Sequence, residues 1–232
     1  MIAHCAPEFS MGDKLMIIQP NSKLLMIGDS ITDCGRARPV GDMWPKGALG
    51  DGYVGFVAAL LDARYPAHNF RVFNMGINGN TVMDLKARWQ TDVLDLKPDW
   101  LSICIGINDV WLQFARPQMT EKHIRLDVYT RILDELVTET KPMLRGLILM
   151  SPYYIEPNRS EPVRAIMDTY GTAVRQIAEK HQAIFVDTQA VFDALLTQTH
   201  SSAFAWDRVH SNQAGHMALA RAFLQSVGYE WE

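Results

Sequence analysis

The turn that follows the first apolar run of this sequence carries a serine that could act as a nucleophile. Residues 23–27 (Lys-Leu-Leu-Met-Ile) follow a Pro-Asn-Ser turn and are typical of a buried strand in a parallel sheet. Gly28 then permits a tight bend, and Ser30 follows at the carboxyl end of the predicted strand, where open α/β sheets bind their ligands. Ser30 is therefore a candidate nucleophile, although a serine in this position also serves as the N-cap of a helix.

A second group, near the carboxyl terminus, could activate such a serine. Asp207 precedes His210 by three residues, ahead of a predicted final helix. At this spacing the carboxylate can reach imidazole Nδ1 within one turn of loop, which fixes the tautomer that leaves Nε2 free to accept a proton. Metal ligation by Asp207, His210 and His216 is the alternative, but no Cys or Glu completes a recognisable zinc spacing. His216 falls inside the final helix, and we expect it to be a packing or surface residue.

Two glycine-rich segments could supply the hydrogen-bond donors that a reacting carbonyl needs. Residues 74–81 (Asn-Met-Gly-Ile-Asn-Gly-Asn-Thr) follow a predicted strand, and glycine there can expose a backbone N–H to a ligand. Residues 106–109 (Gly-Ile-Asn-Asp) follow another predicted strand, and Asn108 offers a neutral amide donor. Both segments are also ordinary turn sequences, with Asn80 or Thr81 as the N-cap of the next helix.

Strands and helices alternate along the chain in a way that would bring these segments together. Apolar runs predict strands at 23–27, 70–75, 100–105, 144–150 and 183–186. Apolar residues three and four apart predict helices within 52–64, 82–96, 124–136, 163–177 and 217–227. The alternation, without repeats or low-complexity linkers, predicts one doubly wound α/β domain over residues 1–232. Because the carboxyl ends of parallel strands meet at one edge of a sheet, the candidate residues can converge there.

Composition narrows the class of function. The 232 residues are enough for one large domain, and Cys5, Cys34 and Cys104 are too few cysteines for a disulfide framework. A formal net charge of −4 and a pI near 6.0 offer no basic field for nucleic acid. No stretch approaches a membrane span, and the first ten residues lack the pattern of a secretory signal. We therefore expect a cytoplasmic protein that acts on a small molecule, without nucleic-acid or membrane partners, and we expect residues 1–12 to be a poorly ordered extension.

In combination, four segments of the sequence resemble the SGNH (GDSL) hydrolase superfamily. They are Gly-Asp-Ser at 28–30, the glycine pair within 74–81, Gly-x-Asn-Asp at 106–109 and Asp-x-x-His at 207–210. The resemblance implies a three-layer α/β/α, flavodoxin-like fold with a doubly wound sheet of about five parallel strands. Where the common motif has leucine this chain has Ile31, which is a conservative change behind the serine.

The resemblance also implies a role for each candidate residue. Ser30 would be the nucleophile, His210 the general base and Asp207 its orienting partner. The glycine of the family's second segment follows the turn, which favours Gly79 over the nearby Gly76. The implied oxyanion hole consists of three donors, which are the N–H groups of Ser30 and Gly79 and the side chain of Asn108. Neither a metal nor an organic cofactor is required.

Within the superfamily, the longer runs at 27–36, 106–111 and 206–210 look like those of bacterial acetylxylan esterases. This implies a serine esterase that removes acetyl groups from carbohydrate esters such as acetylated xylo-oligosaccharides, through an acyl-enzyme. A lipid-directed esterase or thioesterase with the same triad is one alternative, and a non-catalytic glycan-binding module is another. Aromatic faces suit sugar rings or close a small acyl pocket, whereas core packing is their ordinary role. The residues expected to bind substrate are Asp29, Trp44, Trp111 and Trp206.

The loop over residues 33–50 is longer than a strand-to-helix connection needs. It carries Val40, Met43 and Trp44, apolar side chains that a subunit interface could bury. We therefore expect a homo-oligomer in which this loop contacts a neighbouring subunit or narrows access to Ser30. A monomer whose loop folds back over its own site is the alternative.

Overall fold

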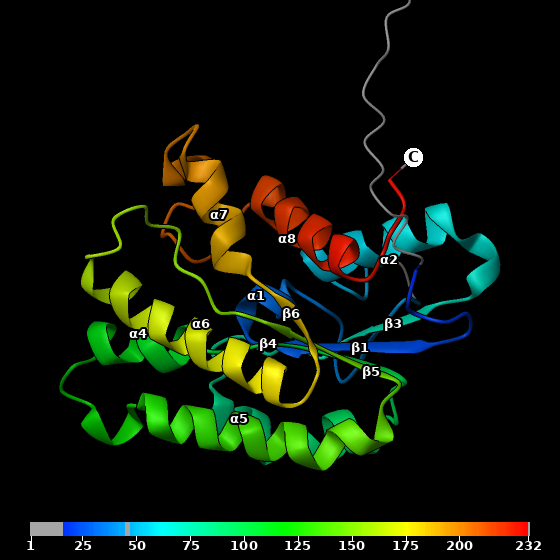
Figure 1. Cartoon of the computed structure of the whole chain (residues 1–232), viewed down its shortest axis with the longest axis horizontal. Helices are drawn as coiled ribbons and strands as arrows, with labels where there is room; N and C mark the ends of the chain where they lie inside the picture. Colours follow the sequence, from blue (N-terminus) through cyan, green and yellow to red (C-terminus); the bar gives the residue numbers. More distant parts are fainter. Residues whose placement is uncertain (1–15, 45–46, 232) are drawn as a thin grey trace, which may run out of the picture.

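Parallel strands form the centre of the structure, a computed structural model that describes residues 16–44 and 47–231. The five parallel strands in these residues are β1 (Lys23–Gly28), β3 (Arg71–Asn74), β4 (Trp100–Cys104), β5 (Gly146–Met150) and β6 (Ile184–Val186). The two-residue strand β2 (Gly41–Asp42) pairs antiparallel with β3 at one edge. The order across the sheet is β2-β3-β1-β4-β5-β6 (Figure 1), so β1 has β3 on one side and β4 on the other.

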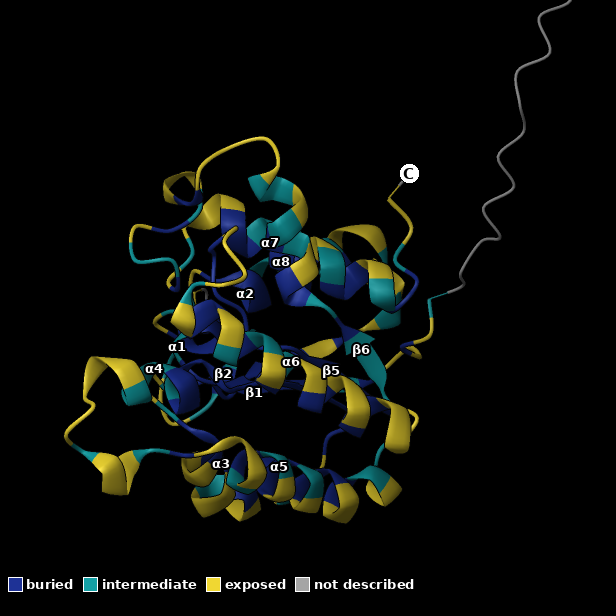
Figure 2. Cartoon of the chain, turned by 60° about the vertical axis from the view of Figure 1, so that its left-hand side comes forward, coloured by how far each residue is buried: buried dark blue, intermediate teal, exposed yellow. Residues whose placement is uncertain are grey.

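Helices cover both faces of this sheet and give the structure three layers (Figures 1 and 2). One face carries α2 (Tyr53–Arg64) and α8 (Gln213–Ser226), with α7 (Thr188–Leu196) packed against α8. The other face carries α3 (Val82–Trp89), α5 (Leu126–Thr140) and α6 (Pro162–Lys180), with α4 (Ile107–Ala115) packed against α6. The shorter helical segments are α1 (Ser30–Asp33), a π-helical turn at Gln90–Leu94, and 3₁₀ turns at Pro66–His68, Thr120–Lys122, Lys141–Met143 and Ser201–Ala203.

The inner strands β1, β4 and β5 are buried on both faces, which explains their continuous apolar sequences (Figure 2). Residues 24–27 of β1 have no exposed surface, and burial of one such aliphatic side chain contributes roughly 1.5–3 kcal/mol. The neighbouring strands β4 and β5 also pack closely at their amino ends. A Cβ on Gly146 of β5 would lie 2.1 Å from the indole ring of Trp100, so the ring packs there only because the residue is glycine.

The predicted α/β/α fold with a doubly wound parallel sheet is confirmed, and the differences concern short elements. The sequence patterns did not predict β2, α1, α4 or α7. The helix predicted within 82–96 is divided into α3 and the π-helical turn. The expected extension at residues 1–12 lies outside the residues that the structure describes.

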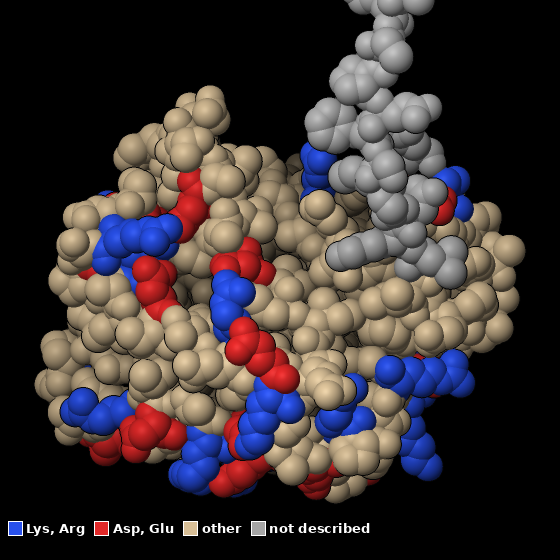
Figure 3. Space-filling model, viewed as in Figure 1, with Lys and Arg blue, Asp and Glu red and all other residues tan. Residues whose placement is uncertain are grey.

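Charged side chains of both signs are mixed on the surface. Figure 3 shows Lys and Arg interspersed with Asp and Glu across one face of the molecule, without a continuous basic stripe on that face. Many of these charges are paired at close range, as between Lys180 and Asp134 at 2.7 Å. Among the helices of the described residues, none combines the length and apolar character needed to cross a membrane.

Candidate active site

Ser30 lies at the carboxyl end of β1, on a turn that the local sequence dictates. A Cβ on Gly28 would lie 2.2 Å from the carbonyl oxygen of Cys104 in the adjacent β4, so this position requires glycine. Asp29 is the N-cap of α1, because its Oδ1 accepts the Ile31 N–H at 3.0 Å. Ser30 is therefore the first helical residue, next to the point where the connections from β1 and β4 run to opposite sides of the sheet.

Ser30, His210 and Asp207 form a hydrogen-bonded series. Ser30 Oγ is 3.0 Å from His210 Nε2, and His210 Nδ1 is 2.6 Å from Asp207 Oδ2. Because the carboxylate accepts the proton on Nδ1, Nε2 is the nitrogen that can accept the serine proton. Ser30 and His210 are 180 residues apart in the chain, so the fold brings them together.

The loop that carries Asp207 also keeps its carboxylate ionised. Asp207 Oδ1 accepts the backbone N–H of Val209 at 3.0 Å and that of His210 at 2.8 Å. Burial alone would raise the pKa of Asp207, but the hydrogen bonds from the His210 side chain and from these two N–H groups outweigh it and hold the pKa below its ordinary value. A charged Asp207 can stabilise the imidazolium that forms when His210 accepts a proton.

The segments that follow β3 and β4 are fixed beside the serine turn by two hydrogen bonds. The Ile77 N–H donates to the carbonyl oxygen of Gly28 at 3.0 Å, which joins residues 74–81 to the end of β1. Asn108 Nδ2 donates to the carbonyl oxygen of Asn80 at 2.9 Å, which joins the start of α4 to the same segment. An amide nitrogen carries two protons, so one N–H of Asn108 remains for another acceptor.

Hydrogen bonding distinguishes Gly79 from Gly76 as a donor. The Gly76 N–H is occupied, because it donates to Asn74 Oδ1 at 2.9 Å, and a Cβ there would lie 2.2 Å from the Asp33 nitrogen. Gly79 adopts φ +80°, and its N–H meets no acceptor within the described part of the chain. The Ser30 N–H, at the first position of a helix, likewise has no intrahelical acceptor. Gly79 is thus the glycine of this segment with a free donor.

A cavity of about 240 Å³ opens beside Ser30 and His210, and its wall includes Cys34 and His216. His216 is 6% exposed, and its Nδ1 accepts the Tyr53 N–H at 3.3 Å, which places its proton on Nε2, 3.3 Å from Cys34 Sγ. Burial raises the pKa of Cys34 to about 12 and lowers that of His216 to about 4, so both groups are neutral. His216 is thus a packing residue, and residues 16–44 and 47–231 contain no group of three or more His, Cys, Asp or Glu that could hold a metal ion.

Two of the four residues expected to bind substrate are not placed to do so in this chain. Asp29 is 1% exposed and caps α1, so its carboxylate is not available to a substrate. Trp44 follows β2, which runs antiparallel to β3 and carries the chain away from the edge that holds Ser30. Its side chain lines a separate hollow of about 670 Å³ with Arg71, at the amino end of β3. Closeness in sequence to Ser30 therefore did not make either residue a substrate contact, because Asp29 is buried and Trp44 lies away from the site.

Trp206 and Trp111, the other two residues expected to bind substrate, lie next to segments of the site. Trp206 immediately precedes Asp207, and 86% of its surface is exposed. Trp111 lies on α4, one turn after Asn108, with its ring centroid 6.3 Å from that of Tyr154. Their contact with a substrate stays a prediction.

Arg88 links the same segments, although no sequence pattern marked it as a residue of the site. Its Nε donates to Asn80 Oδ1 at 2.7 Å, and its two Nη atoms donate to the carbonyl oxygens of Met75 at 2.7 Å and Gly28 at 3.0 Å. One guanidinium thus connects the end of β1 to the segment over residues 74–81 that follows β3. In the sequence Arg88 is only one of several charged residues on the polar face of a helix, where arginine is ordinary.

A serine, a histidine and an aspartate in hydrogen-bonded series at this edge of a doubly wound sheet are typical of serine hydrolases. The chain matches the GDSL-like lipase/acylhydrolase family over residues 26–218, and it belongs to that family. The relationship predicted from four short segments is therefore confirmed.

Individual members of the family are similar over nearly their whole length. The chain is 58% identical over 216 residues to an acetylxylan esterase of Geobacillus stearothermophilus. The matched region covers 93% of this chain and 98% of that protein. The crystal structure of Axe2, an acetylxylan esterase from the same organism, matches with a TM-score of 0.92 at the same identity and coverage. Structures also exist of catalytic mutants of Axe2 in which a serine, a histidine or an aspartate is replaced by alanine. LAE5, an α/β hydrolase from the metagenome of Lake Arreo, Spain, is 49% identical with a TM-score of 0.91, over 92% of this chain and 98% of its own.

Proposed function

We propose that this chain is a serine esterase that removes acetyl groups from carbohydrate esters, with acetylated xylo-oligosaccharides as substrates. One observation carries the proposal: Ser30, His210 and Asp207 are connected at 3.0 and 2.6 Å in a chain 58% identical to an acetylxylan esterase. The free N–H of Gly79 and the second amide proton of Asn108 support it, because ester cleavage needs donors for a developing oxyanion.

The reaction proceeds by acyl transfer in two steps. His210 Nε2 takes the proton of Ser30 Oγ as the oxygen attacks the ester carbonyl, and Asp207 stabilises the imidazolium. The carbonyl oxygen becomes an oxyanion that accepts hydrogen bonds from the Ser30 N–H, the Gly79 N–H and Asn108 Nδ2. The imidazolium then donates its proton to the departing sugar oxygen, which leaves as a hydroxyl, and a water molecule activated by His210 releases acetate from the acyl-enzyme.

Acetate release tests the proposal directly. Purified protein is incubated with acetylated xylo-oligosaccharides, and the acetate formed is compared between the native chain and the Ser30→Ala variant. We expect release by the native chain and none above background by the variant, whose melting temperature should be unchanged because only one oxygen is lost. Full activity of Ser30→Ala would remove Ser30 from the mechanism, and no hydrolysis of any acetyl ester by the native chain would favour a glycan-binding module.

A lipid-directed esterase or thioesterase would use the same triad but a different acyl site. The cavity beside Ser30 is lined by polar groups that include Asp33, Asn78 and His216, which suit a long hydrocarbon chain poorly. Acetyl esters should therefore have a much higher kcat/KM than octanoyl esters. Equal or higher kcat/KM on the octanoyl ester would support the lipid-directed enzyme.

We also propose that the chain forms a homo-oligomer through the loop over residues 33–50. Trp44 on this loop is 83% exposed beside a hollow of about 670 Å³, and a large exposed aromatic side chain of this kind is typical of an interface. Light scattering tests the proposal: a mass near 26.2 kDa at micromolar concentration would contradict it. If the mass is a multiple, Trp44→Ala should weaken the assembly, and an unaffected oligomer would place the interface elsewhere.

We place this reaction in the cytoplasm. The thiols of Cys34 and Cys104 are unpaired, and reduced cysteines suit a compartment in which disulfides are rare. Fractionation of cells that produce the protein, followed by an acetylesterase assay of each fraction, tests this assignment. Activity confined to the culture medium or to an envelope fraction would contradict it.

A further inference from the structure

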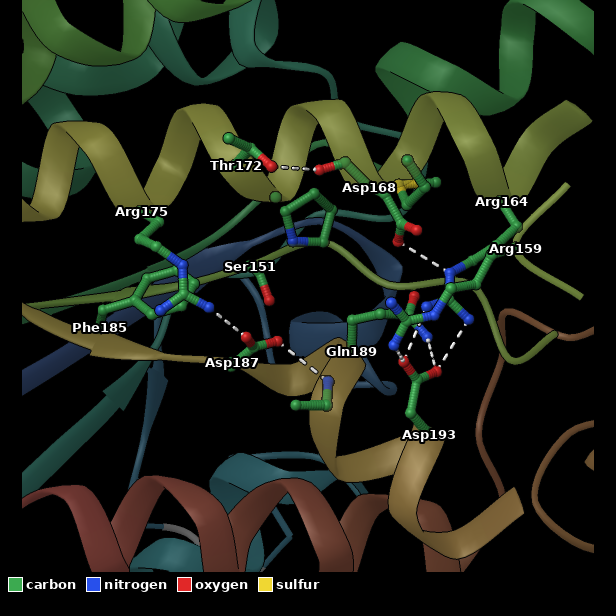
Figure 4. Close-up of a pocket in the computed structure, with 14 residues that line it drawn as sticks. Ser151, Arg159, Arg164, Asp168, Thr172, Arg175, Phe185, Asp187, Gln189 and Asp193 are labelled. Atoms are coloured by element: carbon green, nitrogen blue, oxygen red, sulfur yellow. Dashed lines mark hydrogen bonds and ion pairs between the residues drawn. The ribbon is translucent and has the colours of Figure 1, made fainter. Parts of the chain in front are cut away.

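A second cavity, of about 260 Å³, lies between α6 and α7, and the charged side chains in its wall pair with one another (Figure 4). Arg164 is 1% exposed and donates to both carboxylate oxygens of Asp193, each at 2.8 Å. Arg164 also donates to the carbonyl oxygen of Glu156 at 2.5 Å. Asp193 in turn accepts from Gln189 Nε2 at 2.9 Å, and Gln189 Oε1 accepts the Tyr154 N–H at 2.8 Å. The wall of this cavity thus fixes the segment over residues 153–156, which follows β5.

The same segment holds the loop that carries Asp207 and His210. The Ile155 N–H donates to the carbonyl oxygen of Arg208 at 2.9 Å, and Glu156 Oε2 pairs with Arg208 Nη1 at 2.8 Å. Tyr153, which is fully buried, donates through its hydroxyl to the carbonyl oxygen of Val209 at 3.1 Å. Residues 208 and 209 are therefore held through both backbone and side chain by a segment about 50 residues earlier in the chain.

The backbone conformation of Arg208 explains why the loop that carries Asp207 and His210 needs these stabilising contacts. Arg208 has φ +66°, in the left-handed region that residues with a Cβ rarely adopt. This conformation turns the chain so that Asp207 Oδ1 faces the N–H groups of Val209 and His210, while Oδ2 faces His210 Nδ1. If Arg208 relaxed to a negative φ, the carboxylate and the imidazole would lose this alignment.

We propose that Glu156 is a positioning residue for the reaction, because its ion pair with Arg208 keeps this residue in the left-handed conformation that aligns Asp207 with His210. The inference rests on the proposed function of Asp207 and His210. The Glu156 side chain is 12% exposed, and its other oxygen accepts the Asn158 N–H at 2.8 Å, so it acts through Arg208 and not on the substrate.

Arg208 itself is 42% exposed on its side chain, so a direct contact with substrate is the competing explanation for any effect of its replacement. The two explanations differ at glycine. Arg208→Gly removes the guanidinium but accepts a positive φ without strain, whereas Arg208→Ala removes the guanidinium and keeps the strain. A positioning role therefore predicts that Arg208→Gly keeps more activity than Arg208→Ala. A substrate contact predicts that both variants lose the same activity.

The experiment compares Glu156→Ala, Glu156→Gln, Arg208→Ala and Arg208→Gly on 4-nitrophenyl acetate. We expect kcat to fall about 10- to 100-fold in Glu156→Ala and Arg208→Ala with KM almost unchanged, because a misaligned base slows the chemical step. The fall in kcat should be smaller in Glu156→Gln, which keeps an acceptor for the Asn158 N–H. Arg208→Gly should have a kcat close to that of the native protein. In the Arg208→Gly background, Glu156→Ala should have no further effect on kcat. Glu135→Gln, at a surface ion pair with Lys86, is the matched control and should keep full activity.

A readout that does not depend on activity separates this inference from the proposed function. The proton between Asp207 and His210 Nδ1 should give a low-field resonance in the nuclear magnetic resonance spectrum of the native protein. We expect this signal to be lost or broadened in Glu156→Ala and Arg208→Ala and retained in Arg208→Gly, with melting temperatures showing that each variant is folded. The inference is overturned if the signal and kcat survive in Glu156→Ala, or if Arg208→Gly and Arg208→Ala lose activity equally through KM. A native signal with this pattern but without esterase activity would contradict only the proposed function.

Discussion

Asn108 donates a hydrogen bond from Nδ2 to the carbonyl oxygen of Asn80, at 2.9 Å, and thereby commits one of its two amide protons to holding its own orientation. The bond also links the segment after β4 to the segment after β3. A donor held in this way before substrate arrives needs no reorganisation when charge develops on the carbonyl oxygen, which is the condition for effective oxyanion stabilisation.

Removal of the Asn108 side chain should affect the reaction rate more than the stability of the fold. We expect Asn108→Ala to lower kcat by on the order of 10²–10³, the usual loss when one oxyanion donor is removed. The lost bond to Asn80 is partly exposed and should cost only about 1 kcal/mol in the free energy of unfolding. Steady-state kinetics and urea unfolding measure the two effects. An unchanged kcat together with a large loss of stability would make Asn108 a turn residue only.

The two glycines of the neighbouring segment should respond differently to alanine. At Gly76 a Cβ would lie 2.2 Å from the Asp33 nitrogen and 2.6 Å from the carbonyl carbon of Thr32, so the backbone must shift. At Gly79 a Cβ would meet nothing within 4 Å, and only the left-handed conformation is penalised, by about 1–2 kcal/mol. We therefore expect Gly76→Ala to be the more destabilising variant in urea unfolding. The reverse order would show that Gly76 does not pack tightly against the backbone of Thr32 and Asp33 in solution.

The sheet and the triad could be predicted because their signals are local in the sequence. Each long strand is a continuous apolar run, and the residues 28–30 and 207–210 carry their chemistry within a few positions of one another. The order of strands and helices then places the ends of β1, β3 and β4 together without any knowledge of side-chain contacts. The choice of Gly79 over Gly76 came instead from the resemblance to the superfamily, and the occupied N–H of Gly76 supports it.

Elements that depend on contacts distant in sequence could not be predicted. β2 has two residues, which is too short to show any period, and its antiparallel direction is what carries Trp44 away from Ser30. The start of α4 contains Asn108 and Asp109, whose turn preference concealed the helix. Arg88 and Glu156 act by bonds to backbone and loops far along the chain, and no local pattern marks such residues.

Two buried carboxyl groups should make the protein less stable as the pH rises. Burial raises the pKa of Asp29 to about 7 and that of Asp109 to about 8, above their ordinary value of 3.8. From about pH 4 to these values the folded protein holds protons that the unfolded chain has lost, so unfolding releases protons and stability falls with rising pH, by on the order of 1 kcal/mol per pH unit for each group. Below about pH 4 both states are protonated and these groups add no further change.

Asp109→Asn tests this prediction, because the amide stays neutral and keeps an acceptor for the Val82 N–H, which Asp109 Oδ1 accepts at 3.0 Å. The free energy of unfolding, measured in urea at about pH 5 and about pH 8, should decline less in this variant than in the native protein. Asp134→Asn is the control. Burial raises the pKa of Asp134, but hydrogen bonds from Lys180 and His181 outweigh it and lower the pKa, so that its contribution is lost only toward acid pH. An Asp109→Asn variant with the native pH dependence would show that Asp109 is ionised in the folded protein.

Cys34 should be unreactive although it lies in the wall of the cavity beside Ser30 and faces His216 at 3.3 Å. A histidine beside a cysteine often creates a reactive thiolate, but here the His216 proton is on Nε2 and burial raises the pKa of Cys34 to about 12. At about pH 8 only roughly one thiol in ten thousand would be ionised, so iodoacetamide should label Cys34 about a thousandfold more slowly than free cysteine. Mass spectrometry of the peptide that contains Cys34 measures the labelling, and esterase activity should persist over the same period. Cys34→Ala is the matched control, since a rapid loss of activity in the native chain that this variant escapes would show that Cys34 is a thiolate paired with a charged His216.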